Sequence, residues 1–255
     1  MPDLLVIGGR NREGEKNMQK TLVGLLVLSA LTLAPGMGFA ADSPQPSLCP
    51  DKEALCKEFE TLVQNEQYTA AISKIDPKAA YSETTRQYIG KAYLGLAPAE
   101  NNTPEQEEQY CRKALEFGAV QAYMGLYFIT VQKDPEAALG YLRQYVATNP
   151  RDSVPYVILG EAELAKNHYQ EADAFLRASK KVARANSPRV EWMLFKANYL
   201  LGNYEDAARM FESAAASGQF DGQVKELASD VRFSGIANRT EFKRFPQFTS
   251  TAARP

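Results

Sequence analysis

The chain has 255 residues, of which 45% are hydrophobic and 24% are charged, and its formal net charge at pH 7 is −2. This composition is typical of a soluble protein with one or two domains. No stretch gathers many lysines and arginines, which argues against a nucleic-acid partner, because neutralising phosphates requires clustered cations.

Residues 18–40 have the features of a secretory signal peptide. Met18 and Lys20 form a short positive start, an apolar run covers 21–34, and small residues precede a cleavage position after Ala40. We therefore predict a periplasmic protein with no membrane span after cleavage. The alternative is an inner-membrane anchor formed by an uncleaved signal segment, although a span needs about 20 apolar residues.

The residues on either side of this segment have different roles. Residues 1–17 fit no signal peptide, and we interpret them as an upstream extension outside the mature protein, with Met18 as the initiator; the alternative is a long positive leader. Residues 41–50 are rich in proline and serine and predict an extended linker. The folded part is expected to begin at Asp51.

From residue 51 to residue 216 the apolar residues recur with helical periodicity, and turn signals divide them into helix pairs. Leu55 and Phe59 lie on one face of the first helix, and its partner ends early at Asp76-Pro77, so the first pair is predicted to be a short N-terminal cap. Further helices are expected after Thr103-Pro104, over 119–131 and 134–147, and over the pairs 153–182 and 188–216.

One helix-turn-helix unit is written twice between residues 149 and 214. Three pairs of equivalent residues are 35 apart: Tyr169 and Tyr204, Ala172 and Ala207, and Leu176 and Phe211. A fixed period of this size, with small and aromatic residues in one order, indicates a stacked helical repeat, because each helix pair is too small to bury its apolar face alone.

The order of these residues resembles the pattern of the tetratricopeptide family: an aromatic residue, Leu-Gly, a second aromatic residue, a small residue, Phe and a terminal Pro. The resemblance implies an all-α fold, a right-handed α-solenoid of about five helix-turn-helix pairs over 51–216. It also implies a non-enzymatic scaffold for protein–protein interaction, without a cofactor, whose first helices line a concave groove for a peptide.

The resemblance places six residues in this groove: Gln87, Lys91, Tyr123, Tyr127, Val157 and Glu161. The frame of the 119–147 unit is ambiguous, because registering on Ala138 selects the two tyrosines and registering on Met124-Gly125 selects Ala122 and Leu126 instead. The last unit has the same ambiguity. The groove offers few cations, Lys91 and Lys196, so capture of an acidic C-terminus is not favoured.

The three cysteines, Cys49, Cys56 and Cys111, allow at most one intrachain disulfide. We favour Cys49–Cys56, which requires the chain to fold back before the first helix, because seven residues of helix hold two sulfurs too far apart. The alternatives are a Cys56–Cys111 bridge and a buried free thiol at Cys111. The chain contains no CxxC motif, which argues against a thiol redox enzyme and a zinc ribbon.

No motif in the sequence indicates catalysis. His168 is the only histidine, so His-dependent triads and multi-histidine metal sites are excluded. The acidic residues have the spacing of solvent-facing helix positions, and we find no phosphate-binding glycine loop. We therefore predict no catalytic residue and no metal site.

Residues 217–255 are predicted to form a capping helix and a tail. The helix is expected over Asp221 to Arg232, with Val224, Leu227 and Val231 facing the last pair. Phe242, Phe245 and Phe248 are expected to pack back onto the repeats or, alternatively, to form an exposed docking tail. The predicted partner is a protein or peptide of an envelope assembly. The alternative is a structural component that forms homo-oligomers through an uncapped terminal repeat.

Overall fold

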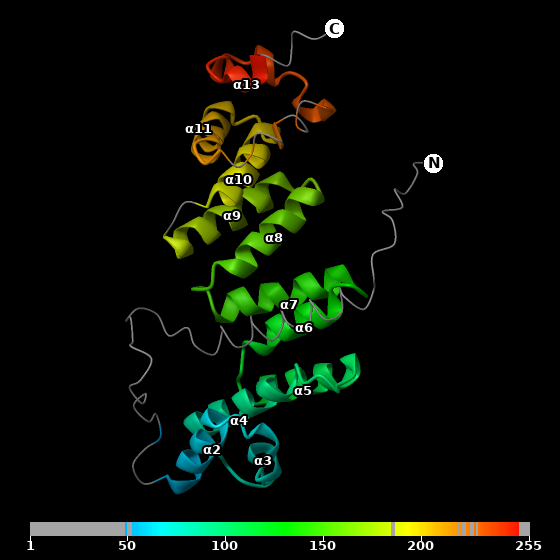
Figure 1. Cartoon of the computed structure of the whole chain (residues 1–255), viewed down its shortest axis with the longest axis vertical. Coiled ribbons are helices and arrows are strands. Elements are labelled where there is room, and N and C mark those ends of the chain that lie inside the picture. Colours follow the sequence, from blue (N-terminus) through cyan, green and yellow to red (C-terminus); the bar gives the residue numbers. More distant parts are fainter. Residues whose placement is uncertain are drawn as a thin grey trace. The chain divides into compact units, whose positions relative to one another are not determined.

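The computed structural model describes residues 49, 53–184, 187–218, 220, 223, 224, 227 and 229–249. Every regular element in this part is a helix, and none is long and apolar enough to cross a membrane. The chain divides into two compact units at Tyr145. Figure 1 labels the helices of both units. The predicted extension, the signal peptide and most of the linker lie outside the described residues.

In the N-terminal unit α2 (Ala54–Gln64) packs with α3 (Tyr68–Ser73) and α4 (Glu83–Leu96) packs with α5 (Pro104–Glu116), as the turn signals predict. The unit also contains α6 (Ala122–Thr130) and α7 (Pro135–Thr148), the second of which continues past the boundary. α3 is the shortest of them and ends before Asp76-Pro77, in agreement with a short first pair.

Local sequence determines where α5 begins. The Gln106 amide donates to Thr103 Oγ1 over 3.3 Å, and the Thr103 amide donates to Gln106 Oε1 over 2.8 Å. This reciprocal capping satisfies two amides that a helix N-terminus leaves without partners, and Pro104 has no amide hydrogen to satisfy.

The first helix pair is closed by a covalent bond. A disulfide joins Cys49 and Cys56, with their Cα atoms 5.6 Å apart, and Cys56 lies in the first turn of α2. Both cysteines and Phe59 are buried in the core of this pair. Leu55 is 40% exposed, so its predicted place on the buried face of α2 is wrong; it lies one position before Cys56, which takes that face.

The C-terminal unit contains two longer pairs followed by short helices. Its elements are α8 (Val154–Ala165), α9 (Tyr169–Ala183), α10 (Pro188–Leu200), α11 (Tyr204–Ala215), the 3₁₀ helices η1 (Val231–Phe233), η2 (Ile236–Asn238) and η3 (Thr240–Phe242), and α13 (Pro246–Thr249). Asn167 and Gly202, with φ values of 64° and 81°, end α8 and α10 in the left-handed conformation that reverses the chain.

The repeated residues form the core of these pairs. Ala172, Leu176, Ala207 and Phe211 are all fully buried. A Cβ atom on Gly160 would lie 2.6 Å from Leu176 Cγ, which is closer than carbon atoms pack. Glycine is therefore required where α8 crosses α9.

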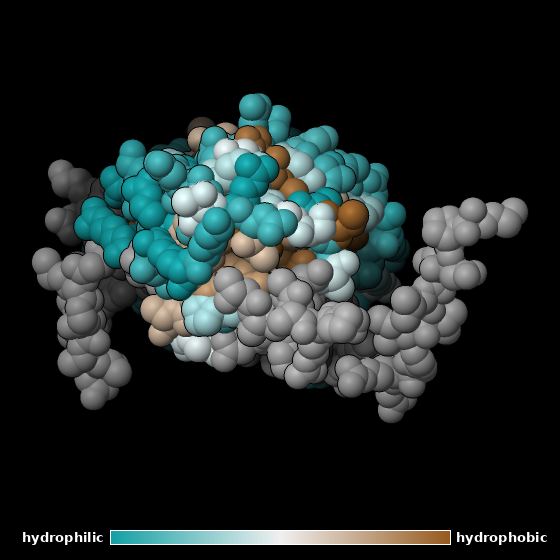
Figure 2. All heavy atoms as spheres, turned by 90° about the horizontal axis from the view of Figure 1, so that it is seen from above, coloured by the Kyte–Doolittle hydropathy of each residue, from teal (hydrophilic) through white to brown (hydrophobic). Residues whose placement is uncertain are grey.

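A cluster of aromatic side chains covers the last helix pair. Phe242, Phe245 and Phe248 are buried and pack with Phe211, so they are not an exposed docking tail. On the face shown in Figure 2, most of the described residues are hydrophilic, and the hydrophobic ones form small areas between them.

The predicted capping helix is partly wrong. Val224 and Leu227 are helical and buried against the last pair, but Val231 is 81% exposed. Asp230 interrupts the helix: its backbone is extended, and its carboxylate accepts a hydrogen bond from the Arg232 amide over 3.0 Å, which starts η1. Helical periodicity therefore does not continue to Val231.

Candidate functional site

The residues predicted to line a groove in the N-terminal unit differ in exposure. Gln87 is exposed on α4, and Lys91, one turn later, is partly buried with its ammonium 5.1 Å from the centre of the Tyr88 ring. The Tyr88 hydroxyl donates to Glu60 Oε1 over 2.6 Å. This buried bond fixes the ring beneath Lys91, so the lysine lies on a rigid surface.

The structure separates the two frames proposed for α6. Ala122 and Leu126 are fully buried in the core of the N-terminal unit and do not line a groove. Tyr123 and Tyr127 are partly exposed, and Ala138, which sets the frame that selects them, is fully buried. Of the two candidate pairs in α6, a ligand could therefore reach the tyrosines and not Ala122 and Leu126.

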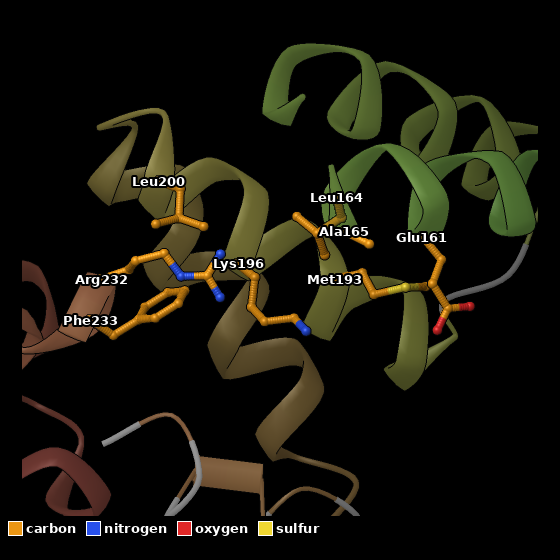
Figure 3. Close-up of a pocket in the computed structure, with 8 residues that line it drawn as sticks. All are labelled: Glu161, Leu164, Ala165, Met193, Lys196, Leu200, Arg232 and Phe233. Carbon is orange, nitrogen blue, oxygen red and sulfur yellow. The ribbon is translucent and has the colours of Figure 1, made fainter. Parts of the chain in front are cut away.

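The C-terminal unit contains a pocket of about 300 Å³ between α8, α10 and η1 (Figure 3). The lining residues are Glu161, Leu164 and Ala165 from α8, Met193, Lys196 and Leu200 from α10, and Arg232 and Phe233 from η1. Among the predicted groove residues, Glu161 lines this pocket, whereas Val157 packs against the adjoining core and is partly buried.

Helical spacing explains why these side chains meet. Met193, Lys196 and Leu200 lie three and four positions apart, so they share one face of α10. The neighbouring positions Trp192, Phe195 and Tyr199 are instead buried in the aromatic core, so Trp192 is a core residue.

The wall contributed by η1 is held by hydrogen bonds. Arg232 donates from Nε to Asp230 Oδ1 over 3.0 Å, from Nη2 to Asp230 Oδ2 over 2.6 Å, and from Nη1 to Asn167 Oδ1 over 3.0 Å. The bonds from Arg232 lower the pKa of Asp230, and those to Asp230 raise the pKa of Arg232. Arg232 therefore ties η1 to the turn between α8 and α9.

The opposite side of the pocket contains a second ion pair. Glu161 Oε2 lies 2.6 Å from Arg189 Nη2, and both side chains are more than half exposed. Such a pair contributes less than about 1 kcal/mol to stability, because water screens it. Its two charges are available to a ligand at this rim.

Sequence reasoning missed Arg232 and Phe233 as site residues. Arg232 was interpreted as the last residue of a capping helix and Phe233 directly follows it, and the break at Asp230 starts the 3₁₀ helix that carries both to the pocket. An aspartate two positions before an arginine is the available signal, since aspartate often caps a turn.

Cys111 and His168 lie outside the pocket, and each is close to groups that affect its chemistry. Cys111 is buried, and burial raises the pKa of its thiol to about 12, which suppresses the reactive thiolate. His168 lies in the turn after α8, with Nδ1 2.8 Å from Oε2 of the buried Glu163. Within the described part of the chain, no group of three or more His, Cys, Asp or Glu side chains is placed to hold a metal ion.

Comparison with known proteins gives a limited result. No family model matches the sequence, and no curated protein matches it. A solved structure named "MamA AMB-1 P212121" has a TM-score of 0.42 and 16% identity, covering 71% of this chain and 95% of its own. The "Crystal structure of Sel1 repeat protein from Oxalobacter formigenes" has a TM-score of 0.37 and 18% identity, covering 77% and 99%.

The side-chain packing within each unit shows what kind of fold the chain has. The second helices carry fully buried alanines at the equivalent positions Ala138, Ala172 and Ala207, and Gly160 lies against Leu176 where α8 and α9 cross. These are the small-residue crossings that a helical repeat requires. In each unit the described residues form all-α helix pairs of the kind that helical repeats contain.

Proposed function

We propose that this protein is a non-enzymatic binding module, exported to the periplasm, that takes a peptide segment of an envelope-assembly partner on the concave face of its first helices. The observation that carries this proposal is the pocket of about 300 Å³ between α8, α10 and η1. A fold by itself does not determine function, so the proposal rests on the chemistry of this surface.

The pocket has both apolar and charged lining residues. Leu164, Ala165 and Leu200 supply accessible apolar surface, Met193 and Phe233 are almost fully buried, and Glu161 and Lys196 supply charge. Most ligand pockets are apolar with a few placed polar groups, and this one is at the small end of the usual range of about 300–1,000 Å³. It suits one or two side chains of a polypeptide better than a large cofactor.

The anchoring of η1 favours a preformed site. Because Arg232 bonds both Asp230 and Asn167, the wall that carries Phe233 is fixed before any ligand arrives. A site that is already ordered loses less conformational entropy on binding, which strengthens affinity for a given set of contacts.

Two features support export. Residues 18–40 have the sequence pattern of a signal peptide, and the Cys49–Cys56 disulfide is of a kind that persists in oxidising compartments such as the periplasm. The disulfide joins residues just before and inside the first helix, where it restrains the start of the folded part.

The aromatic side chains that cover α10 and α11 argue against the alternative, self-association through the C-terminal end. End-to-end stacking of repeats needs an uncovered apolar face at a terminal pair. Within the described residues, that face of the last pair is buried by Val224, Leu227 and the phenylalanines from 233 to 248. This favours a binding module over a component that stacks through its C-terminal end.

Site-specific photo-crosslinking in cells that produce the full chain tests the proposal. A photoreactive amino acid replaces Ala165, an exposed residue of the pocket, and in a matched control it replaces Lys181, an exposed residue of α9 that does not line the pocket. We expect a protein adduct at Ala165 that is weak at Lys181 and is lost when Glu161→Lys and Lys196→Glu are combined.

Other crosslinking outcomes contradict the proposal. Equal adducts from both positions would place the partner outside the pocket. An adduct of the chain with itself would instead support the structural alternative.

A further inference from the structure

We infer that one edge of the C-terminal unit docks on the surface of a membrane that contains anionic phospholipids. This edge is formed by the start of α8, the end of α9 and the start of α10, and we call it the basic edge. Its exposed charged and apolar residues are Arg151, Val154, Lys181, Arg184 and Arg189. The inference goes beyond the proposed function and does not depend on the pocket.

Antiparallel packing brings these helix ends together. Gly160 of α8 faces Leu176 of α9, so the residues that precede Gly160 lie beside those that follow Leu176. Lys180 Nζ at the end of α9 lies 2.6 Å from Glu191 Oε1, which places the start of α10 at the same edge. Figure 1 shows α8 beginning and α9 ending on one side of the C-terminal unit. Folding therefore gathers cations that are spread along the sequence.

The basic edge has more positive than negative charge. Arg189 is exposed but pairs with Glu161, and Lys180 pairs with the buried Glu191. Asp152 is partly buried and accepts the first amide of α8 over 3.0 Å. Even if Asp152 offsets one cation, two positive charges remain, because three exposed cations of this edge have no carboxylate partner among the described residues: Arg151, Lys181 and Arg184.

Helix stability does not explain all of these cations. Lys181 lies in the last turn of α9, where the helix dipole favours a positive charge. Arg189 lies in the first turn of α10, where the dipole disfavours one. Arg184 has a φ of 51°, the left-handed conformation at a helix end that usually selects glycine. The arginines at 184 and 189 therefore stand at positions that local structure does not favour.

An exposed valine at this edge favours a membrane over an acidic polypeptide. Val154 is 44% exposed at the start of α8, next to Arg151. Each cation close to an anionic membrane strengthens binding about fivefold, and an apolar side chain gains by entering the boundary between headgroups and acyl chains. A membrane surface uses both kinds of residue at once. No helix in the described part of the chain is able to span a membrane, so the contact is a surface contact.

Fluorescence from one position of the full chain tests the inference. An environment-sensitive fluorophore is attached to Ser187→Cys, an exposed position of the basic edge, and in a matched control to Gln170→Cys, which is exposed at the opposite end of α9. The free thiol of Cys111 is buried and does not compete for the label. The vesicles contain phosphatidylglycerol and phosphatidylcholine, or phosphatidylcholine alone, with brominated lipids that quench a fluorophore at the acyl chains.

We expect the fluorophore at position 187 to shift to shorter wavelength and to be quenched with the anionic vesicles at low salt, but not with the neutral vesicles. The fluorophore at position 170 should change far less. Raising the salt to the physiological level should weaken the response, because salt screens exposed charges. Reading the signal at one residue separates contact at the basic edge from membrane binding by the apolar run at 21–34.

Charge variants identify the residues responsible. Lys181→Glu combined with Arg184→Glu should lower the apparent affinity for anionic vesicles at least about tenfold. Val154→Ser should lower it by a smaller factor. Lys78→Glu combined with Lys243→Glu changes the net charge equally at exposed positions outside the basic edge, and should have less effect than the first pair. Circular dichroism verifies that each variant is folded.

Several outcomes overturn the inference. Equal responses to anionic and neutral vesicles, equal responses at positions 187 and 170, or equal losses in the two charge-reversed pairs show that the basic edge does not dock on an anionic surface. A response to a polyglutamate peptide but not to vesicles shows that the edge binds an acidic polypeptide instead. Crosslinking from Ala165 reports on the pocket separately, so the inference can fail while the proposed function stands.

Discussion

The two units close their terminal helix pairs by different chemistry. The first pair, α2 and α3, is short and is restrained by the Cys49–Cys56 disulfide and by hydrogen bonds to the Glu53 carboxylate. The last pair, α10 and α11, is covered by a cluster of buried aromatic side chains. A terminal repeat lacks one neighbour, and this chain compensates covalently and with polar groups at its start, but by apolar burial at its end.

This comparison predicts the largest loss of stability in the aromatic cluster. Phe211 is fully buried, and its ring centre lies 4.6 Å from that of Phe248 and 4.8 Å from that of Phe245. We expect Phe211→Ala to lower the free energy of unfolding by about 3–5 kcal/mol, because it removes apolar contacts and leaves a cavity. Urea denaturation measures the loss, and hydrogen exchange assigns it to the C-terminal unit.

Val231 provides the control for this experiment. Its side chain is 81% exposed at the start of η1, so Val231→Ala is expected to change the free energy of unfolding by less than about 0.5 kcal/mol. A loss below about 1 kcal/mol in Phe211→Ala, or hydrogen exchange that rises only before residue 146, would show that the aromatic cover does not stabilise the last pair.

The disulfide is expected to have the second-largest effect. Its two cysteines are seven positions apart. Closing a loop of this length lowers the conformational entropy of the unfolded chain, which stabilises the folded state by roughly 2–3 kcal/mol. Cys49→Ala should lose about that amount, and hydrogen exchange should rise in α2 and α3 first. A reducing agent should bring the unaltered protein to the same stability and leave the variant unaffected, which also shows that Cys111 takes no part.

A smaller effect is expected at the helix crossing of the C-terminal unit. Gly160→Ala places a Cβ atom 2.6 Å from Leu176 Cγ, and relieving this contact costs about 1–3 kcal/mol, of which the better helix propensity of alanine recovers up to about 1 kcal/mol. We therefore expect a net destabilisation in thermal unfolding.

Gly140 is the matched position in the N-terminal unit. It lies inside α7, and a Cβ atom there meets no other atom within 4 Å. Gly140→Ala should therefore stabilise the protein by up to about 1 kcal/mol through helix propensity alone. If both substitutions shifted stability in the same direction, the close crossing of α8 and α9 would not be what selects glycine at position 160.

Glycine positions also show how far the sequence predicts the fold. The helix pairs follow from turn signals and from apolar spacing, and the repeated Ala172 and Ala207 are buried as the period predicts. Gly125 and Gly160 share the same period but have different neighbours. A Cβ atom on Gly125 would lie 2.6 Å from Cys111 Sγ of the preceding pair, whereas Gly160 faces Leu176 of its own pair.

This difference in packing explains why the frame of α6 was ambiguous. A glycine permits a close approach from either side, and the sequence does not state which helix takes the space. The candidate site was predictable to a similar extent: Glu161 follows from the repeat, but Arg232 reaches the pocket only because Asp230 ends a helix that periodicity alone would continue.

The smallest predicted effect concerns the polar closure of the first pair. The Ser82 hydroxyl donates to Glu53 Oε1 over 2.6 Å, and the Thr85 hydroxyl donates to the same oxygen over 2.5 Å. These bonds favour the charged carboxylate and hold the pKa of Glu53 below its ordinary value of 4.5. The unfolded chain lacks the bonds, so at acid pH it binds this proton more readily than the folded chain does.

The sign of the pH dependence follows from this lowered pKa. Above 4.5 the carboxylate is ionised in both states and its stabilisation is fully present; as pH falls through the lowered pKa of the folded state, the stabilisation is lost. Hydrogen exchange of α2 and α4 should therefore accelerate at acid pH relative to α10 and α11, once the intrinsic pH dependence of exchange is removed. Glu53→Gln should weaken this dependence, because glutamine does not titrate. If the variant retained the full dependence, the acid sensitivity of the first pair would originate in another group, and the polar part of its closure would contribute nothing measurable beside the disulfide.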